Sequence, residues 1–103
     1  MGKKEIKGIK KFLIKLKKDF GVSRVVFFGS RANGNPKKYS DIDLIIVSDD
    51  FKNMNFFERV SKMYDYWDLD YPVDFLCYTN KEFDILKIKI SIVKEALKHG
   101  ILI

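Results

Sequence analysis

The sequence predicts a single α/β domain in which helices pack on both sides of a small β-sheet. Three observations predict this fold class. Apolar residues recur at helical spacing in several stretches, short β-branched and aromatic runs lie between those stretches, and no repeat or linker interrupts the chain. With 103 residues the chain can bury a core but has no room for a separate acceptor-binding domain. We therefore expect one domain over residues 1–103.

The first helix is expected over residues 4–20. Apolar side chains recur there at alternating spacings of three and four, and lysines fill the positions between them. These apolar residues are Ile6, Ile9, Leu13, Leu16 and Phe20. Gly21 is expected just past the helix end, in the left-handed conformation that glycine tolerates. The helix should bury one face and turn its lysines to solvent.

A first strand and a turn should follow. Val25–Phe28 is a continuous apolar run, which is typical of a strand buried on both faces, and Gly29 ends it. Ser30 is a candidate cap for a short helix through Ala32. The residues from Asn33 to Pro36 are rich in turn formers and would stop that helix.

Two further strands carry acidic residues. Asp41–Val47 is expected to be the second strand, and Asp49-Asp50 should serve as turn and helix-start residues at its far end. Val73–Tyr78 is expected to be the third strand. It carries Asp74 within an otherwise apolar run, which needs an explanation.

Helices should fill the rest of the chain. Residues 54–68 show helical spacing of large apolar residues, and an aromatic stripe of this kind usually packs in a core. The stripe comprises Phe56, Phe57, Val60, Met63, Tyr64 and Trp67. Thr79 and Glu82 fit a capping box that opens another helix, with a break near residues 87–89. A last helix should end at Gly100, before a short strand at its C-terminal side.

Composition narrows the function classes. The net charge is +6, but the lysines are spread over several elements, which favours a solvated face over a nucleic-acid-binding surface. Cys77 is the only cysteine, so neither an intramolecular disulfide nor a cysteine-rich zinc site is expected. No apolar run reaches the roughly 20 residues that span a bilayer, and no signal-peptide core follows the N-terminus. We therefore expect a cytoplasmic protein with no membrane association.

Asp41, Asp43 and Asp74 are the candidate metal ligands. Alternate strand residues point the same way, so Asp41 and Asp43 should share a face with their Cα atoms about 6.6 Å apart. Asp74 would join them if its strand pairs beside the second strand. Such a cluster is costly without a cation, and carboxylate oxygens suit magnesium. An isolated Asp-x-Asp often serves only to cap turns, so the pair alone does not indicate a metal.

Gly29 and Ser30 are the candidate phosphate-binding residues. A glycine lets a bound group approach the backbone closely, and the serine offers both a hydroxyl and an amide at a predicted helix start. Taken alone, a Gly-Ser pair is simply a turn. Its position between two predicted strands, with the Asp-x-Asp on the second, makes the joint pattern informative.

Other motifs can be excluded at particular residues. Gly29 and Gly34 have the glycine spacing of a P-loop, but Asn35-Pro36 stands where the lysine and hydroxyl residue should follow. An EF-hand would need an oxygen ligand and a glycine at the positions of Ile45 and Ile46. His99, near a helix end, is expected at the surface or as a cap rather than as a base.

Gly29-Ser30, ten residues and then Asp41-Ile42-Asp43 resembles the signature of the DNA polymerase beta-type nucleotidyltransferase superfamily. The surrounding GSRANG and SDIDLIIV, and the later acid Asp74, resemble its minimal nucleotidyltransferase (MNT) branch, the antitoxin partners of HEPN toxins. The resemblance implies a mixed sheet with helices packed against it, in the palm-like fold of nucleotidyltransferases. It also implies transfer of a nucleoside monophosphate from a nucleoside triphosphate.

The resemblance assigns roles to the candidate residues. It implies that Gly29 and Ser30 bind the triphosphate, that Asp41 and Asp43 hold two magnesium ions, and that Asp74 binds one metal and helps activate the acceptor hydroxyl. Family members often carry a second basic residue where this chain has Asn33, which leaves Arg31 as the expected phosphate-facing cation.

These roles lead to a functional hypothesis with alternatives. We expect a magnesium-dependent enzyme that moves AMP from ATP to a partner protein, a tyrosine of a HEPN toxin, and thereby silences it. One alternative is a non-catalytic antitoxin that neutralises its partner by binding it. Another is nucleotidyl transfer to a small molecule or to RNA.

Overall fold

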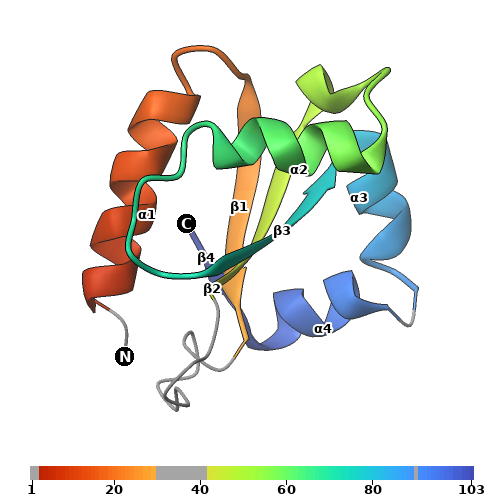
Figure 1. Cartoon of the computed structure of the whole chain (residues 1–103). Helices are drawn as coiled ribbons and strands as arrows, with labels where there is room; N and C mark the ends of the chain where they lie inside the picture. The colour runs from red at the N-terminus through yellow and green to blue at the C-terminus, as the bar shows by residue number, and fades with distance from the viewer. Residues whose placement is uncertain (1–2, 30–41, 90) are drawn as a thin grey trace.

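The computed structural model describes residues 3–29, 42–89 and 91–103 (Figure 1). Its helices are α1 (Lys3–Leu16), α2 (Phe56–Tyr64), α3 (Asn80–Leu86), α4 (Ile92–His99) and a short 3-10 helix, η1 (Asp49–Phe51). Its strands are β1 (Val22–Phe28), β2 (Ile42–Ser48), β3 (Val73–Tyr78) and β4 (Ile101–Leu102). The predicted order of helices and strands is confirmed over the described ranges. The predicted short helix through Ala32 lies outside them.

The four described strands form one mixed sheet in the order β3-β2-β1-β4. β1 pairs antiparallel with both β2 and β4, whereas β2 and β3 run parallel. The expected α/β class with a mixed sheet is therefore confirmed. The parallel pair bears on the predicted site, because it brings corresponding residues of β2 and β3 side by side.

Helices cover both faces of the sheet, with α1 (red) on one side and α3 and α4 (blue) on the other (Figure 1). The side chains of β2 alternate between the two layers. Ile42, Leu44 and Ile46 pack with α1 and α2, while Ile45 and Val47 pack with α3 and α4. Both faces of β2 are thus buried.

The first helix is shorter than expected. α1 ends at Leu16, not near residue 20, and the backbone of residues 17–20 then turns toward β1. The expectation of a left-handed Gly21 is wrong: within the described ranges, Gly29 is the glycine with a positive φ, at 86°. Gly21 instead donates its backbone N–H to the Asp50 carboxylate at 2.7 Å, which ties the turn to the end of β2.

The second long helix is also shorter, and part of its aromatic stripe is exposed. Asn55 and Glu58 form a capping box that starts α2 at Phe56, two residues later than expected, so the expected range of 54–68 is too wide. Met63 is buried, but Phe56 is 57% exposed, Phe57 81% and Tyr64 47%. The core interpretation is wrong for these three residues because α2 lies along β3, an edge strand of the described sheet.

The C-terminal part follows the sequence expectations closely. Thr79 and Glu82 form the predicted capping box at the start of α3. α3 ends at Leu86 and α4 begins at Ile92, which agrees with the break expected near residues 87–89. Gly100 ends α4, and β4 follows it directly. No helix in the described ranges is long and apolar enough to cross a membrane.

Candidate active site

Asp43 and Asp74 lie side by side on the two parallel strands. They are direct partners in the register of β2 and β3, between the pairs Ile42–Val73 and Leu44–Phe75. Because Ile42 and Leu44 point into the α1–α2 layer, Asp43 points to the opposite face, and Asp74 shares that face. The strand pairing on which the predicted role of Asp74 depended is therefore present.

Gly29 meets the Asp43 carboxylate at the end of β1. Its φ of 86° lies in the left-handed region that side chains disfavour. A Cβ atom built on Gly29 would lie 2.1 Å from Asp43 Oδ2, far inside van der Waals contact. Only glycine fits at this position, which is the first residue of the Gly-Ser pair singled out above.

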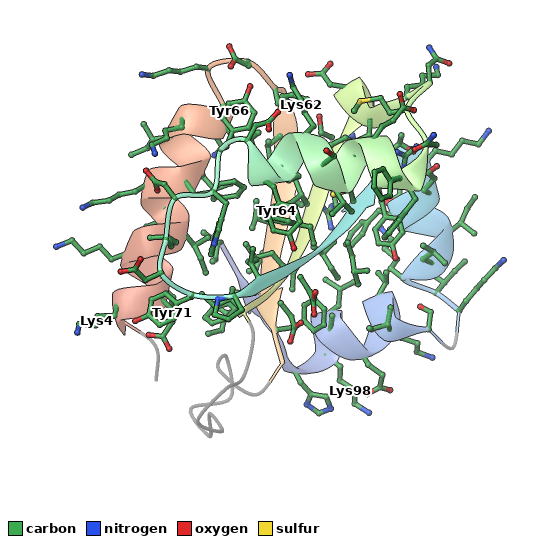
Figure 2. The ribbon with its side chains drawn as sticks, viewed as in Figure 1. Lys4, Lys62, Tyr64, Tyr66, Tyr71 and Lys98 are labelled. Atoms are coloured by element: carbon green, nitrogen blue, oxygen red, sulfur yellow. The ribbon has the colours of Figure 1, made fainter. Side chains whose placement is uncertain are left out.

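The two carboxylates line a cavity of about 410 Å³. The other lining residues are mostly apolar and come from β1, α2, β3 and α4: Phe28, Phe56, Val60, Tyr64, Phe75, Leu76 and Ile92. The Tyr64 side chain reaches from α2 toward β3 (Figure 2), where its hydroxyl donates to the Val73 carbonyl at 2.6 Å. The site thus combines two acids with an apolar wall.

Three predicted site residues, Ser30, Arg31 and Asp41, lie outside the described residues. The predicted ligand set is described only at Asp43 and Asp74, and the phosphate-binding set only at Gly29. Within the described ranges no group of three or more histidine, cysteine, aspartate and glutamate side chains is placed to hold a metal ion. The three-carboxylate cluster stays a prediction.

The described donors nevertheless fit magnesium. Asp43 and Asp74 supply carboxylate oxygens on one face, the donor type that this hard cation prefers. The missing side chain at Gly29 makes room for the Asp43 carboxylate, because a Cβ there would collide with its Oδ2 atom. The Asp43 carboxylate is therefore held against the backbone at the end of β1, beside the cavity.

The acidic residues at the other end of β2 have structural roles, as predicted. Ser48 caps η1 by accepting the Asp50 backbone N–H. The Asp49 carboxylate accepts the Asn80 backbone N–H at 3.0 Å, and this hydrogen bond lowers the Asp49 pKa. The Asp50 carboxylate accepts from Gly21. These acids join three elements and lie away from the candidate site.

His99 and Cys77 have no catalytic setting. The His99 side chain is 64% exposed in the last turn of α4, with its Nε2 atom 3.8 Å from Glu95. Its predicted surface position is confirmed. Cys77 is buried, and burial raises the pKa of its thiol to about 12. A thiol that stays protonated is a poor nucleophile.

Sequence reasoning missed a second cavity and the arginine beside it. Arg59 donates to the carbonyls of Met54 and Cys77 and to the Glu82 carboxylate, and its side chain is only 11% exposed. The cavity, of about 500 Å³, lies between α2, β3 and α3. The Asn55–Glu58 capping signal would have located the start of α2 and hence the exposed aromatic residues at its first turn.

Comparison with known proteins identifies the family. The profile described as "Nucleotidyltransferase domain" matches residues 6–99. The chain belongs to this nucleotidyltransferase family. The family match spans all the described site residues, Gly29, Asp43 and Asp74, and agrees with the resemblance carried by the Gly-Ser and Asp-x-Asp motifs.

Relatives and solved structures agree with the family. A Haemophilus influenzae protein named "Probable protein adenylyltransferase MntA" is 36% identical over 61 residues, which cover 59% of this chain and 54% of that protein. The match thus spans about half the length of this relative. A Sulfolobus solfataricus structure described as a nucleotidyltransferase has a TM-score of 0.64 and is 27% identical, and the match covers 93% of this chain and 76% of the Sulfolobus chain. A second structure described as a nucleotidyltransferase has a TM-score of 0.50 and is 31% identical, and the match covers 84% of this chain and 89% of the other chain.

Proposed function

We propose that this member of the nucleotidyltransferase family transfers AMP from ATP to a hydroxyl group of a partner protein. One observation carries the proposal: Asp43 and Asp74 are register partners on parallel strands, and the Asp43 carboxylate lies against Gly29. Two acids on one face suit nucleotidyl transfer, because that reaction needs charge neutralisation and positioning. The name of the Haemophilus influenzae relative supports a protein as the acceptor.

In this proposal Gly29, Ser30 and Arg31 bind the triphosphate. The Gly29 backbone allows close approach, the Ser30 hydroxyl and amide donate to phosphate oxygens, and the Arg31 guanidinium offsets their charge. These contacts hold the α-phosphate near the strand ends. ATP is the proposed co-substrate.

Asp41, Asp43 and Asp74 hold the divalent metal in the same scheme, as a site for two magnesium ions. Bound magnesium would neutralise phosphate charge and stabilise the attacking and leaving oxygens. The role of the protein is to bring the three carboxylates together on β2 and β3 and to keep them facing the nucleotide. The fixed register of the parallel pair provides that placement for Asp43 and Asp74.

Asp74 then acts on the acceptor. The acceptor oxygen forms a bond to the α-phosphorus of ATP while the bond to pyrophosphate breaks, and the hydroxyl proton passes to the Asp74 carboxylate and on to solvent. A base held next to the acceptor accelerates such a step by roughly 10²- to 10⁴-fold. The products are the AMP ester and pyrophosphate, so atoms and charge balance.

The proposed acceptor is a tyrosine of a HEPN-type toxin, which adenylylation would silence. The test combines the protein, labelled ATP, magnesium chloride and a HEPN-type protein encoded beside this chain. We expect label on the HEPN-type protein with wild type and none with Asp43→Asn. Absence of transfer by wild type, or equal transfer by Asp43→Asn, would contradict the proposal.

A second candidate is neutralisation by binding alone, and the exposure of Phe56 and Phe57 on α2 favours it. Under this function Asp43→Asn would neutralise the toxin as well as wild type does. Under the enzymatic function the same variant would bind the toxin but leave it active. Measuring the activity of the toxin with both proteins at matched, saturating concentrations separates the two.

A further inference from the structure

The candidate site is one part of a longer depression beside β3. The cavity at Asp43 and Asp74 and the cavity beside Cys77 share Phe56 as a lining residue, so they adjoin along this strand. We name the joined cavities the β3 groove, bounded by α2 on one side and by α3 and α4 on the other. The residues used below to follow it are Phe56, Tyr64, Cys77, Ile85 and Ile92.

The β3 groove exposes an unusual amount of large apolar side chain. Phe56 is 57% exposed, Tyr64 47%, Ile85 44% and Ile92 55%. These are half of the exposed large hydrophobic residues in the described ranges, and they come from three separate helices. An exposed apolar surface to which several helices contribute is typical of a binding site, whereas single exposed apolar residues are common on any protein.

A partner strand cannot simply extend the sheet here. Pro72 directs its carbonyl to Ile42 of β2, so alternate residues along β3 turn their peptide groups away from β2. Two of the outward carbonyls already accept hydrogen bonds from α2: that of Val73 from the Tyr64 hydroxyl, and that of Cys77 from Arg59. These side chains obstruct strand addition at both ends of the edge.

The charges of the β3 groove disfavour nucleic acid as its occupant. Its charged lining residues are Asp43, Asp74 and an ion pair in which Arg59 contacts Glu82 at 2.6 Å. No lysine of the described ranges lines either cavity. Lysines instead project from the outer surfaces, as Lys4 on α1 and Lys98 on α4 illustrate (Figure 2). Phosphate-rich RNA needs several cations along its path, and the described lining residues of the groove do not supply them.

We propose that the β3 groove is the docking site for the acceptor protein. The occupant is an apolar, uncharged segment of that protein, which seats its side chains between α2 and the α3–α4 pair without pairing as a strand. The segment brings the acceptor hydroxyl to Asp74. The docking part of the proposal is supported by the exposed apolar residues of the groove alone. The delivery of the hydroxyl to Asp74 rests on the proposed transfer activity.

The test compares two exposed isoleucines on different helices. Ile85 lines the β3 groove but not the cavity that holds the acids, and Ile14 lies on α1 and is 65% exposed. Binding of the Ile85→Asp and Ile14→Asp variants to the HEPN-type protein is measured by titration calorimetry without nucleotide. We expect Ile85→Asp to bind at least about tenfold more weakly and Ile14→Asp to match wild type. Thermal unfolding of both variants shows that each is folded.

Other outcomes overturn the docking proposal. Equal affinity of Ile85→Asp and wild type would do so, as would a wild-type protein that does not bind the HEPN-type protein at all. The proposal would also fail if wild type bound a 20-nucleotide RNA, or self-associated in sedimentation, and Ile85→Asp did not. Either result would identify a different occupant of the groove. Asp43→Asn distinguishes the two proposals: if it transfers AMP normally, the proposed chemistry fails while the calorimetric result on docking stands.

Discussion

The two ends of β2 both carry or adjoin acidic residues, and the protein uses them in opposite ways. At the closed end, formed by Ser48, Asp49 and Asp50 with Gly21 and Asn80, the carboxylates accept backbone N–H groups of neighbouring elements. At the open end, formed by Gly29, Asp43 and Asp74, two carboxylates from neighbouring strands line one cavity.

The difference shows how to separate a structural acid from a candidate ligand. Asp49 and Asp50 each face an amide donor, so their charge is satisfied within the fold and ties elements together. Asp43 and Asp74 bring two carboxylates together on one face, a placement that a bound cation would stabilise. This juxtaposition, more than a place at a strand end, is the reason for proposing the open end as the functional site.

The clearest test of this difference between the two ends is to neutralise one acid at each end. Under the proposed function, Asp43→Asn should lower AMP transfer by roughly 10²-fold or more, because a carboxylate of the proposed metal site is lost. Asp50→Asn should leave the rate unchanged and cost about 1 kcal/mol of stability at most, since the amide oxygen can still accept from Gly21. Initial rates with labelled ATP and urea unfolding measure both. Equal losses of activity in the two variants would remove the distinction between the ends.

The two glycines beside these acids give a second test. Gly29→Ala should destabilise the fold by about 3 kcal/mol and displace the Asp43 carboxylate, because of its positive φ and the 2.1 Å overlap with Oδ2. Gly21→Ala should change stability by less than about 1 kcal/mol, since its Cβ would lie 3.6 Å from Asp50.

Urea denaturation of the two alanine variants measures the contrast between the glycines. An activity assay of Gly29→Ala under conditions where it is folded then isolates the effect on the site. If Gly29→Ala were as stable and active as wild type, the close approach of Gly29 to Asp43 would be required neither for folding nor for activity. A severe loss in Gly21→Ala would instead show that the closed end is the less tolerant one.

Most of the fold could be predicted from the sequence because its signals are local. The continuous runs Val25–Phe28 and Val73–Tyr78 predicted strands, and the Thr79–Glu82 pair predicted a helix start. The errors lie where distant contacts decide. α1 ends early as the chain turns into β1, where Asp19 accepts from Tyr66 far along the chain. The helical spacing of apolar residues and lysines in residues 4–20 cannot reveal a contact with a residue so distant in sequence.

The candidate site was predictable in its residues but not in its surroundings. The Gly-Ser and Asp-x-Asp motifs are local, so Gly29 and Asp43 could be singled out at once. The register that brings Asp74 beside Asp43 depends on a parallel pairing between strands about 30 residues apart, and such pairings leave no local pattern. The exposure of Phe56 was missed for a similar reason: helical spacing gives the side of a helix, not the element that covers it.

Arg59 joins α2, β3 and α3 beside the second cavity. Replacing it in Arg59→Leu removes its hydrogen bonds to Glu82 and to the Met54 and Cys77 carbonyls, and leaves both carbonyls without this donor. We expect a loss of about 2 kcal/mol in the free energy of unfolding. Arg24→Leu is the control, because Arg24 stacks over Phe83 at 5.6 Å from an exposed position and should cost less than about 1 kcal/mol. Equal costs would show that Arg59 has no special structural role.

The smallest effect expected is a pH dependence of stability from Glu82. The hydrogen bond from Arg59 lowers the Glu82 pKa below its ordinary value of 4.5. A lowered pKa in the folded state stabilises the fold above pH 4.5, and this contribution is lost as the pH falls through the folded-state value. Because the Glu82 side chain is 44% exposed, solvent screening limits the contribution to about 1 kcal/mol. Unfolding from pH 6 to pH 3 should therefore show a shallower loss of stability in Glu82→Gln than in wild type. Arg59→Leu should flatten the same part of the curve, and parallel curves for all three proteins would show that the pair does not contribute.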